Sequence, residues 1–212
     1  MPSTVMHLAF GKTVYEGLKD IIKDKELFLM GNLLPDESLI KNNSHYRIKA
    51  STSDYKIPDL NIAKERLFDI NNPLHLGAFA HLYYDHFFFE SFFLPLFDFQ
   101  NGIVTNRKSG EVWRKEDFFT RAVFYSAYGE LNHLFLNDGY VTYEDILSLP
   151  KILPQANIEE LDQRREINWQ DEVLYFLENR IEYKGNILNY GEVVCSMKKI
   201  ACEFIEFLKS NM

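Results

Sequence analysis

Two polar residues stand four positions apart in an otherwise apolar and aromatic stretch, PLHLGAFAHLYYDHFFFESFF at positions 73–93: His81 and Asp85. On a helix, this spacing leaves two side chains only about 40° apart on one face. An imidazole and a carboxylate stacked in this way can chelate one metal ion. Gly77, one turn earlier on the same stripe, leaves room for other groups to approach. The alternative interpretation is a core histidine neutralised by its own helix.

Helical phase separates this pair from its polar neighbours. Asn72 is predicted to be the N-cap of the helix, because its side chain can accept from a free N–H of the first turn. His86 would lie about 140° from His81, and Glu90 about 180° from it. His75 is eleven positions from His86 and shares its direction. We therefore expect none of these three to be a metal ligand.

Three further residues offer nitrogen or oxygen ligands: His7, Asp36 and His45. Each has a plainer interpretation, respectively a surface histidine near a helix cap, a Pro-Asp turn and a solvated loop histidine. Together with His81 and Asp85 they form a mixture of imidazoles and carboxylates. Zinc accepts this mixture at low coordination number.

Charge and cysteine content restrict the partners and the compartment. The formal net charge of −8 argues against nucleic acid and anionic membranes as electrostatic partners. Cys195 and Cys202 lie about two helical turns apart, too far for an intrahelical disulfide, which indicates a reducing compartment. The sequence shows no secretory signal and no run of about 18 apolar residues that could span a membrane. We therefore expect a cytoplasmic protein.

Apolar periodicity predicts a single all-α domain over residues 1–212, a multi-helix orthogonal bundle around the central His-x-x-x-Asp helix. The expected elements are helices near 5–23, 25–33, 61–68, 73–93, 116–137, 169–183 and 190–209. Residues 41–58 are predicted to be a long polar loop, which in a compact domain is often functional. Residues 97–113 are predicted to be either a small hairpin near 101–113 or an irregular loop.

The order of the candidate ligands resembles a known family. A histidine near the start, Asp36 in GNLLPDES, His45 in SHYR and then His81-x-x-x-Asp85 resemble the zinc-dependent phospholipase C family, and more distantly the S1/P1-type nucleases. The opening MPSTVMH and the GNLLPDES segment look like the short, intracellular-type members. The resemblance covers roughly residues 1–90 and implies an all-α bundle.

The resemblance also implies roles for these residues. It assigns Asp36, His45, His81 and Asp85 to one zinc ion, and His7 to a second one with Asp85 as the bridge. One or two zinc ions would then serve phosphoester hydrolysis by lowering the pKa of a water molecule and neutralising phosphoryl oxygens. Asp36 could orient that water as a general base, so Asp36 and Asp85 are the expected catalytic residues. The implied substrate is a small phosphoester or a phospholipid.

The chain departs from the family pattern in its possible additional ligands. Secreted members use the amino group of their mature N-terminus, whereas this chain has no signal to remove. A third zinc site of the family uses His-x-x-x-Glu, and this chain offers only Glu130 and His133, three apart and in the reverse order. Helical reach would still allow that pair to join the site.

Two other functions stay open at this point. An HD-type phosphohydrolase is also helical and rich in His and Asp, but it needs an adjacent His-Asp pair, and Asp85-His86 has the reverse order. The non-enzymatic alternative is a helical protein with a structural or degenerate metal site. A structural zinc site is closed by four protein ligands, and Asp36, His45, His81 and Asp85 could fill all four positions.

Overall fold

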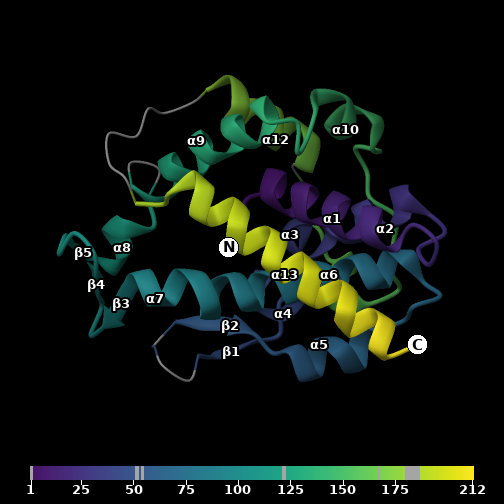
Figure 1. Cartoon of the computed structure of the whole chain (residues 1–212), viewed down its shortest axis with the longest axis horizontal. Coiled ribbons are helices and arrows are strands. Elements are labelled where there is room, and N and C mark those ends of the chain that lie inside the picture. Colours follow the sequence, from purple (N-terminus) through teal and green to yellow (C-terminus); the bar gives the residue numbers. More distant parts are fainter. Residues whose placement is uncertain (1, 51–52, 54, 121–122, 167, 180–186) are drawn as a thin grey trace.

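The computed structural model describes residues 2–50, 53, 55–120, 123–166, 168–179 and 187–212. Helices dominate the fold (Figure 1). The longer helices are α1 (Thr4–Leu18), α2 (Lys25–Gly31), α5 (Leu60–Leu67), α6 (Pro73–Phe87), α9 (Phe124–Asn137), α12 (Trp169–Glu178) and α13 (Tyr190–Ser210). The short helices are α3 (Leu34–Glu37), α4 (Lys41–Ser44), α7 (Leu94–Leu96), α8 (Lys115–Phe118), α10 (Tyr143–Ser148) and α11 (Glu159–Asp162).

The expectation of an all-α fold is wrong, because five short strands form two antiparallel sheets. The first sheet pairs β1 (Arg47–Lys49) with β2 (Lys56–Pro58), within the segment predicted to be a polar loop. The strands have three residues each, and β1 is half-buried to exposed along its length. Three residues are too few to show the period-two alternation that identifies a strand, and Ile48, the apolar residue of β1, is 43% exposed.

The second sheet has the order β3 (Phe97–Gln100), β4 (Ile103–Asn106) and β5 (Val112–Arg114). The hairpin expected near 101–113 is thus part of a three-stranded sheet. Its first turn uses Asn101 and Gly102, both with positive φ (51° and 76°), the backbone that an Asn-Gly pair adopts in tight hairpins. Phe97 and Phe99 point into the core, while Asp98 between them is half-buried.

Backbone contact between α2 and α6 fixes the centre of the molecule. A Cβ atom at Gly77 would lie 2.0 Å from the carbonyl oxygen of Phe28, and one at Gly31 would lie 2.0 Å from that of Leu74. The two helices can therefore pack this closely only because both positions are glycine. The room that Gly77 leaves on its stripe is filled by the backbone of α2, which brings the end of α2 beside His81.

The predicted central helix begins as expected but does not continue regularly to Phe93. Asn72 is its N-cap and accepts from the N–H of His75 (3.3 Å), with Pro73 at the first helical position. After Phe87 the chain widens into a π-helix, η1 (Phe88–Phe93). The helix expected over 116–137 is divided into α8 and α9, and residues 121–122 between them lie outside the described residues. The end of the helix expected over 169–183 also lies outside them.

Helix α13 crosses the face formed by α1 and α6 (Figure 1). Phe204 is its central contact, with ring centroids 6.2 Å from Phe10 of α1 and 5.9 Å and 4.8 Å from Phe79 and Tyr83 of α6. Its apolar face is buried, whereas its opposite face is exposed. Among the described residues, none of the helices combines the length and apolar character needed to cross a membrane.

Candidate metal centre

The fold brings together the five residues singled out by the sequence. His7 lies in α1, Asp36 in α3, His45 at the C-terminal end of α4, and His81 and Asp85 in α6. The three histidines are fully buried, Asp85 is 1% exposed and Asp36 is 8% exposed. We call these residues the His/Asp cluster. Two sets of their ligand atoms, each within 4.8 Å of one another, could hold a metal ion: His7, Asp36 and His81, and His45, His81 and Asp85.

The two carboxylate oxygens of Asp85 face different histidines. Oδ1 lies 3.4 Å from Nε2 of His7. Oδ2 lies 3.5 Å from Nε2 of His45 and 3.8 Å from Nε2 of His81. Neither oxygen has a hydrogen-bond partner among the described residues, although the carboxylate is buried. A buried carboxylate in this state lacks a cation or a donor.

The Nε2 atoms of His45 and His81 also lack a suitable partner. Nδ1 of His81 donates to the carbonyl of Asn32 (2.8 Å), and Nδ1 of His45 donates to that of Lys41 (2.9 Å). Both Nε2 atoms are therefore lone-pair acceptors, yet they lie only 3.2 Å apart. Burial lowers the pKa of His45 to about 4 and that of His81 to about 3, so neither ring carries the missing proton at neutral pH.

A metal ion fits this arrangement. Histidine ligands commonly donate their other ring N–H to a carbonyl or carboxylate, which fixes the ring and presents a lone pair. His45 and His81 already do so, and Asp85 supplies unpaired oxygens between them. Neutral imidazole together with carboxylate is a donor set that zinc accepts.

Asn32, the residue after α2, positions the two histidines on neighbouring helices. With its oxygen facing α6, its side-chain amide donates to the carbonyl of His7 (2.8 Å) and accepts from the backbone N–H of His81 (3.3 Å). The imidazoles of His7 and His81 stack with centroids 3.6 Å apart and planes within 8°. Asn32 is fully buried, so this brace between α1 and α6 is shielded from water.

Asp36 forms the edge of the cluster and is paired with a lysine that the sequence analysis did not single out. Its Oδ1 accepts from Nζ of Lys41 at 2.8 Å and lies 3.7 Å from Nε2 of His45. Burial alone would raise the pKa of Asp36, but the ammonium group of Lys41 and the nearby imidazoles hold it well below its usual range. Asp36 therefore stays ionised at neutral pH.

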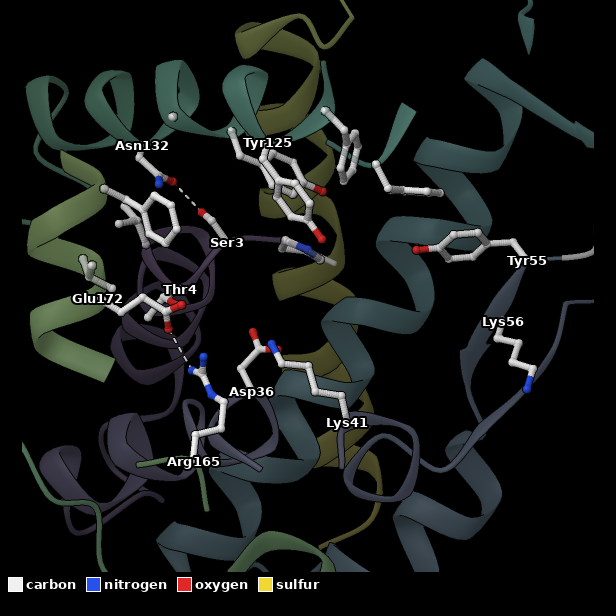
Figure 2. Close-up of a pocket in the computed structure, with 18 of the residues that line it drawn as sticks. Ser3, Thr4, Asp36, Lys41, Tyr55, Lys56, Tyr125, Asn132, Arg165 and Glu172 are labelled. Atoms are coloured by element: carbon white, nitrogen blue, oxygen red, sulfur yellow. Dashed lines mark hydrogen bonds and ion pairs between the residues drawn. The ribbon is translucent and has the colours of Figure 1, made fainter. Parts of the chain in front are cut away.

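A pocket of about 750 Å³ opens beside this edge (Figure 2). Of the five cluster residues, Asp36 lines it, between Lys41 and Arg165 in the view. Helix α9 contributes Tyr125, Tyr128, Gly129 and Asn132 to the opposite wall. Asn132 accepts a hydrogen bond from Ser3, which ties this wall to the start of α1. Elsewhere in the lining, Arg165 pairs with Glu172 of α12 (2.8 Å).

The other histidines of the described chain have partners outside the cluster or stay apart from it. Nε2 of His75 bonds to the carbonyl of Ala156 (2.7 Å). His86 bonds to the carbonyl of Pro58 (2.7 Å) and to Glu90 (3.1 Å). Glu130 and His133 belong to neither set of possible ligands, so helical reach does not bring that pair to the site.

Sequence reasoning missed the pocket residues. Tyr125, Tyr128, Gly129 and Asn132 have the spacing i, i+3, i+4 and i+7, which marks one face of a helix and could have indicated a common wall. Lys41 and Arg165 carry no such signal, because their positions depend on pairing with Asp36 and with Glu37 and Glu172.

Comparisons with known proteins do not place the chain in a family: no family model, curated protein or solved structure matches it.

Proposed function

We propose that this protein is a metal-dependent phosphoester hydrolase that uses zinc at the His/Asp cluster. The observation that carries the proposal is the position of Asp36. A structural zinc site is closed by its ligands, whereas a catalytic site keeps one side open to water and substrate. The cluster is buried elsewhere, but its Asp36 edge borders a pocket large enough for a small organic molecule.

The ordered histidines and aspartates of residues 1–90, similar to those of zinc-dependent phospholipase C, support the same reaction class. In this reaction the P–O bond to the alcohol breaks and a P–O bond to water forms, while one proton of water passes to the departing oxygen. Zinc, when bound, supplies a Lewis acid that stabilises the phosphoryl charge and makes water more acidic.

The chain's own residues have separate roles in this proposal. His45, His81 and Asp85 would hold one ion together with Asp36, and His7 would hold a second ion through the other oxygen of Asp85. The different directions of the two Asp85 oxygens, toward His7 and toward His45, suit this bridging role. Asp36, at the pocket edge, is the carboxylate placed to orient an attacking water as its general base.

We further propose a cytoplasmic location, supported by the exposed and unpaired state of Cys195 and Cys202.

Elemental analysis of protein prepared without chelator and without an affinity-tag metal tests the first step. We expect one or two zinc ions per chain. The zinc-loaded protein should hydrolyse 4-nitrophenyl phosphate or bis(4-nitrophenyl) phosphate, lose this activity with chelator and regain it with zinc. Stoichiometric metal without hydrolysis across a broad phosphoester panel would favour a structural site, and absence of bound metal would contradict the proposal altogether.

A further inference from the structure

The pocket beside the His/Asp cluster is basic, although the chain is acidic. Five basic and two acidic side chains line it, in a chain with 23 basic and 31 acidic residues: Lys41, Arg47, Lys56, Lys115 and Arg165, against Asp36 and Glu172. Lys56 points away from the pocket centre (Figure 2), but the other four basic side chains still outnumber the two acidic ones. A cleft lined by one sign of charge concentrates ligands of the opposite sign. This pocket therefore suits an anion.

Lys41 brings this positive charge to the edge of the cluster. Its Nζ donates to Asp36 at 2.8 Å, and its own backbone carbonyl accepts from the ring of His45 at 2.9 Å. The backbone of Lys41 thus orients His45, and its side chain places a positive charge beside Asp36. Both of these residues are candidate metal ligands. Its side chain is 39% exposed, so it can turn part of its donor capacity toward a ligand in the pocket.

Tyr128 offers a donor from the opposite wall. The residue is 4% exposed and lines the pocket, and its hydroxyl group has no hydrogen-bond partner among the described residues. A buried hydroxyl without a partner carries a free-energy cost that a bound ligand can remove. Lys41 and Tyr128 therefore give the pocket two hydrogen-bond donors, one on a partly exposed side chain and one on a buried side chain.

Part of the remaining wall is aromatic. Tyr55 and Tyr125 extend into the pocket from two sides in Figure 2, and Phe119, Phe124 and Phe176 complete this part of the lining. Such a surface accepts an apolar or ring-shaped group. It could also surround a quaternary ammonium group, but the basic side chains oppose a cation, and the carboxylate of Glu172 is already paired with Arg165.

We propose that the pocket selects phosphomonoester dianions that carry an apolar or aromatic group, with Lys41 as the specificity-determining residue and Tyr128 as a second phosphate donor. This inference rests on the proposed phosphoester hydrolysis. A dianion gains from the extra cation at Lys41, whereas a zwitterionic choline phosphodiester carries one negative charge on phosphorus and brings a positive charge into a basic pocket.

The first experiment compares kcat/KM of the zinc-loaded protein for three chromogenic esters: 4-nitrophenyl phosphate, bis(4-nitrophenyl) phosphate and 4-nitrophenylphosphorylcholine. We expect the monoester to be preferred and the choline ester to be the poorest substrate. Lys41→Gln should lower kcat/KM for the monoester about tenfold, mainly through KM, and should change the choline ester less than about twofold. Lys41→Arg should restore most of the loss.

Lys151→Gln is the matched control. Lys151 also pairs with an aspartate, Asp171, at 2.9 Å, but it does not line the pocket. Zinc content should equal that of the wild type in the control and in both Lys41 variants. Equal losses for the monoester and the choline ester in Lys41→Gln, or a wild-type preference for the choline ester, would overturn the inference while leaving the hydrolase intact.

The second experiment does not depend on turnover. Calorimetric titration of the zinc-loaded protein with phenylphosphonate and with its monomethyl ester compares a dianion with a monoanion of similar shape. We expect tighter binding of phenylphosphonate, about tenfold weaker binding in Lys41→Gln, and a few-fold weakening in Tyr128→Phe. If no ester is hydrolysed but this pattern holds, the proposed reaction fails and the anion site stands. Unchanged phenylphosphonate binding in Lys41→Gln would contradict the proposed role of Lys41 in selecting dianions.

Discussion

The helix α6 and the π-helix after it carry two histidine–carboxylate pairs with identical spacing. In the inner pair, His81 and Asp85 are 0% and 1% exposed. In the outer pair, His86 and Glu90 are 16% and 41% exposed. Both histidines donate Nδ1 to a backbone carbonyl of another segment, at 2.8 Å and 2.7 Å. The pairs are thus alike in sequence spacing and in the anchoring of the ring.

They differ in what their Nε2 atoms meet. The outer Nε2 lies 3.1 Å from a carboxylate oxygen of Glu90, at a position that water can also reach. The inner Nε2 lies 3.8 Å from Asp85 and 3.2 Å from another lone pair, that of His45. An i, i+4 spacing therefore identifies where a site can form, but the segments packed around it decide whether the pair is left needing a cation.

The largest expected difference between the pairs is in metal binding and catalysis. Asp85→Asn should lower kcat/KM for phosphoesters on the order of 10³-fold, because one of its oxygens faces each half of the cluster. His7→Ala should cost less, since His7 faces one oxygen. Glu90→Gln and His86→Gln should leave zinc content and activity unchanged. Elemental analysis with steady-state kinetics checks this comparison, and full activity in Asp85→Asn would refute the proposed bridging role.

A smaller effect is expected on the free energy of unfolding when Gly77, one helical turn before His81, is replaced. Gly77→Ala should lower the free energy of unfolding by about 3 kcal/mol, because the new methyl group would overlap the carbonyl of Phe28. Gly129→Ala is the control: a Cβ atom there meets nothing within 4 Å, so alanine should raise helix stability by roughly 0.5–1 kcal/mol. Urea unfolding measures both changes. Equal stabilities would show that α2 and α6 can separate without cost.

The smallest effect is expected in how the stability of the zinc-free protein depends on pH. The folded-state pKa values of about 4 for His45 and about 3 for His81 lie below the usual 6.5, so the folded state binds fewer protons than the unfolded state between these values. Stability is then complete above about pH 6.5 and falls as the pH drops toward 4, with about 2 kcal/mol per histidine lost by pH 5. His81→Gln should flatten this dependence, whereas His86→Gln should leave it steep. Urea unfolding at pH 7 and pH 5 distinguishes the two variants.

The sequence predicts local features of α6 well. The N-cap at Asn72 and the common face of His81 and Asp85 depend on contacts within a few residues, which helical geometry fixes. The capping box of Thr142 and Asp145 is likewise a contact between residues only three apart. His7, Asp36 and His45 could be related to the inner pair only through a resemblance, because their approach depends on how α1, α3 and α4 pack.

The failures also have a physical pattern. The strands β1 and β2 were expected to be loop, since pairing between Arg47 and Pro58 is a contact across ten residues that neither strand encodes alone. Gly31 reads as a helix break until its partner Gly77 is known. Lys41 reads as a loop lysine until Asp36 faces it. In each case the missing information is a neighbour distant along the chain.

The packing of α13 has a consequence for synthesis on the ribosome. All five residues of the cluster lie within the first 85 positions, so a nascent chain carries them long before α13 emerges. Until then Phe10, Phe79 and Tyr83 lack the ring of Phe204 that covers them. Unfinished or C-terminally truncated chains would present this aromatic face to one another, and we expect them to aggregate whether or not the His/Asp cluster binds the proposed ion.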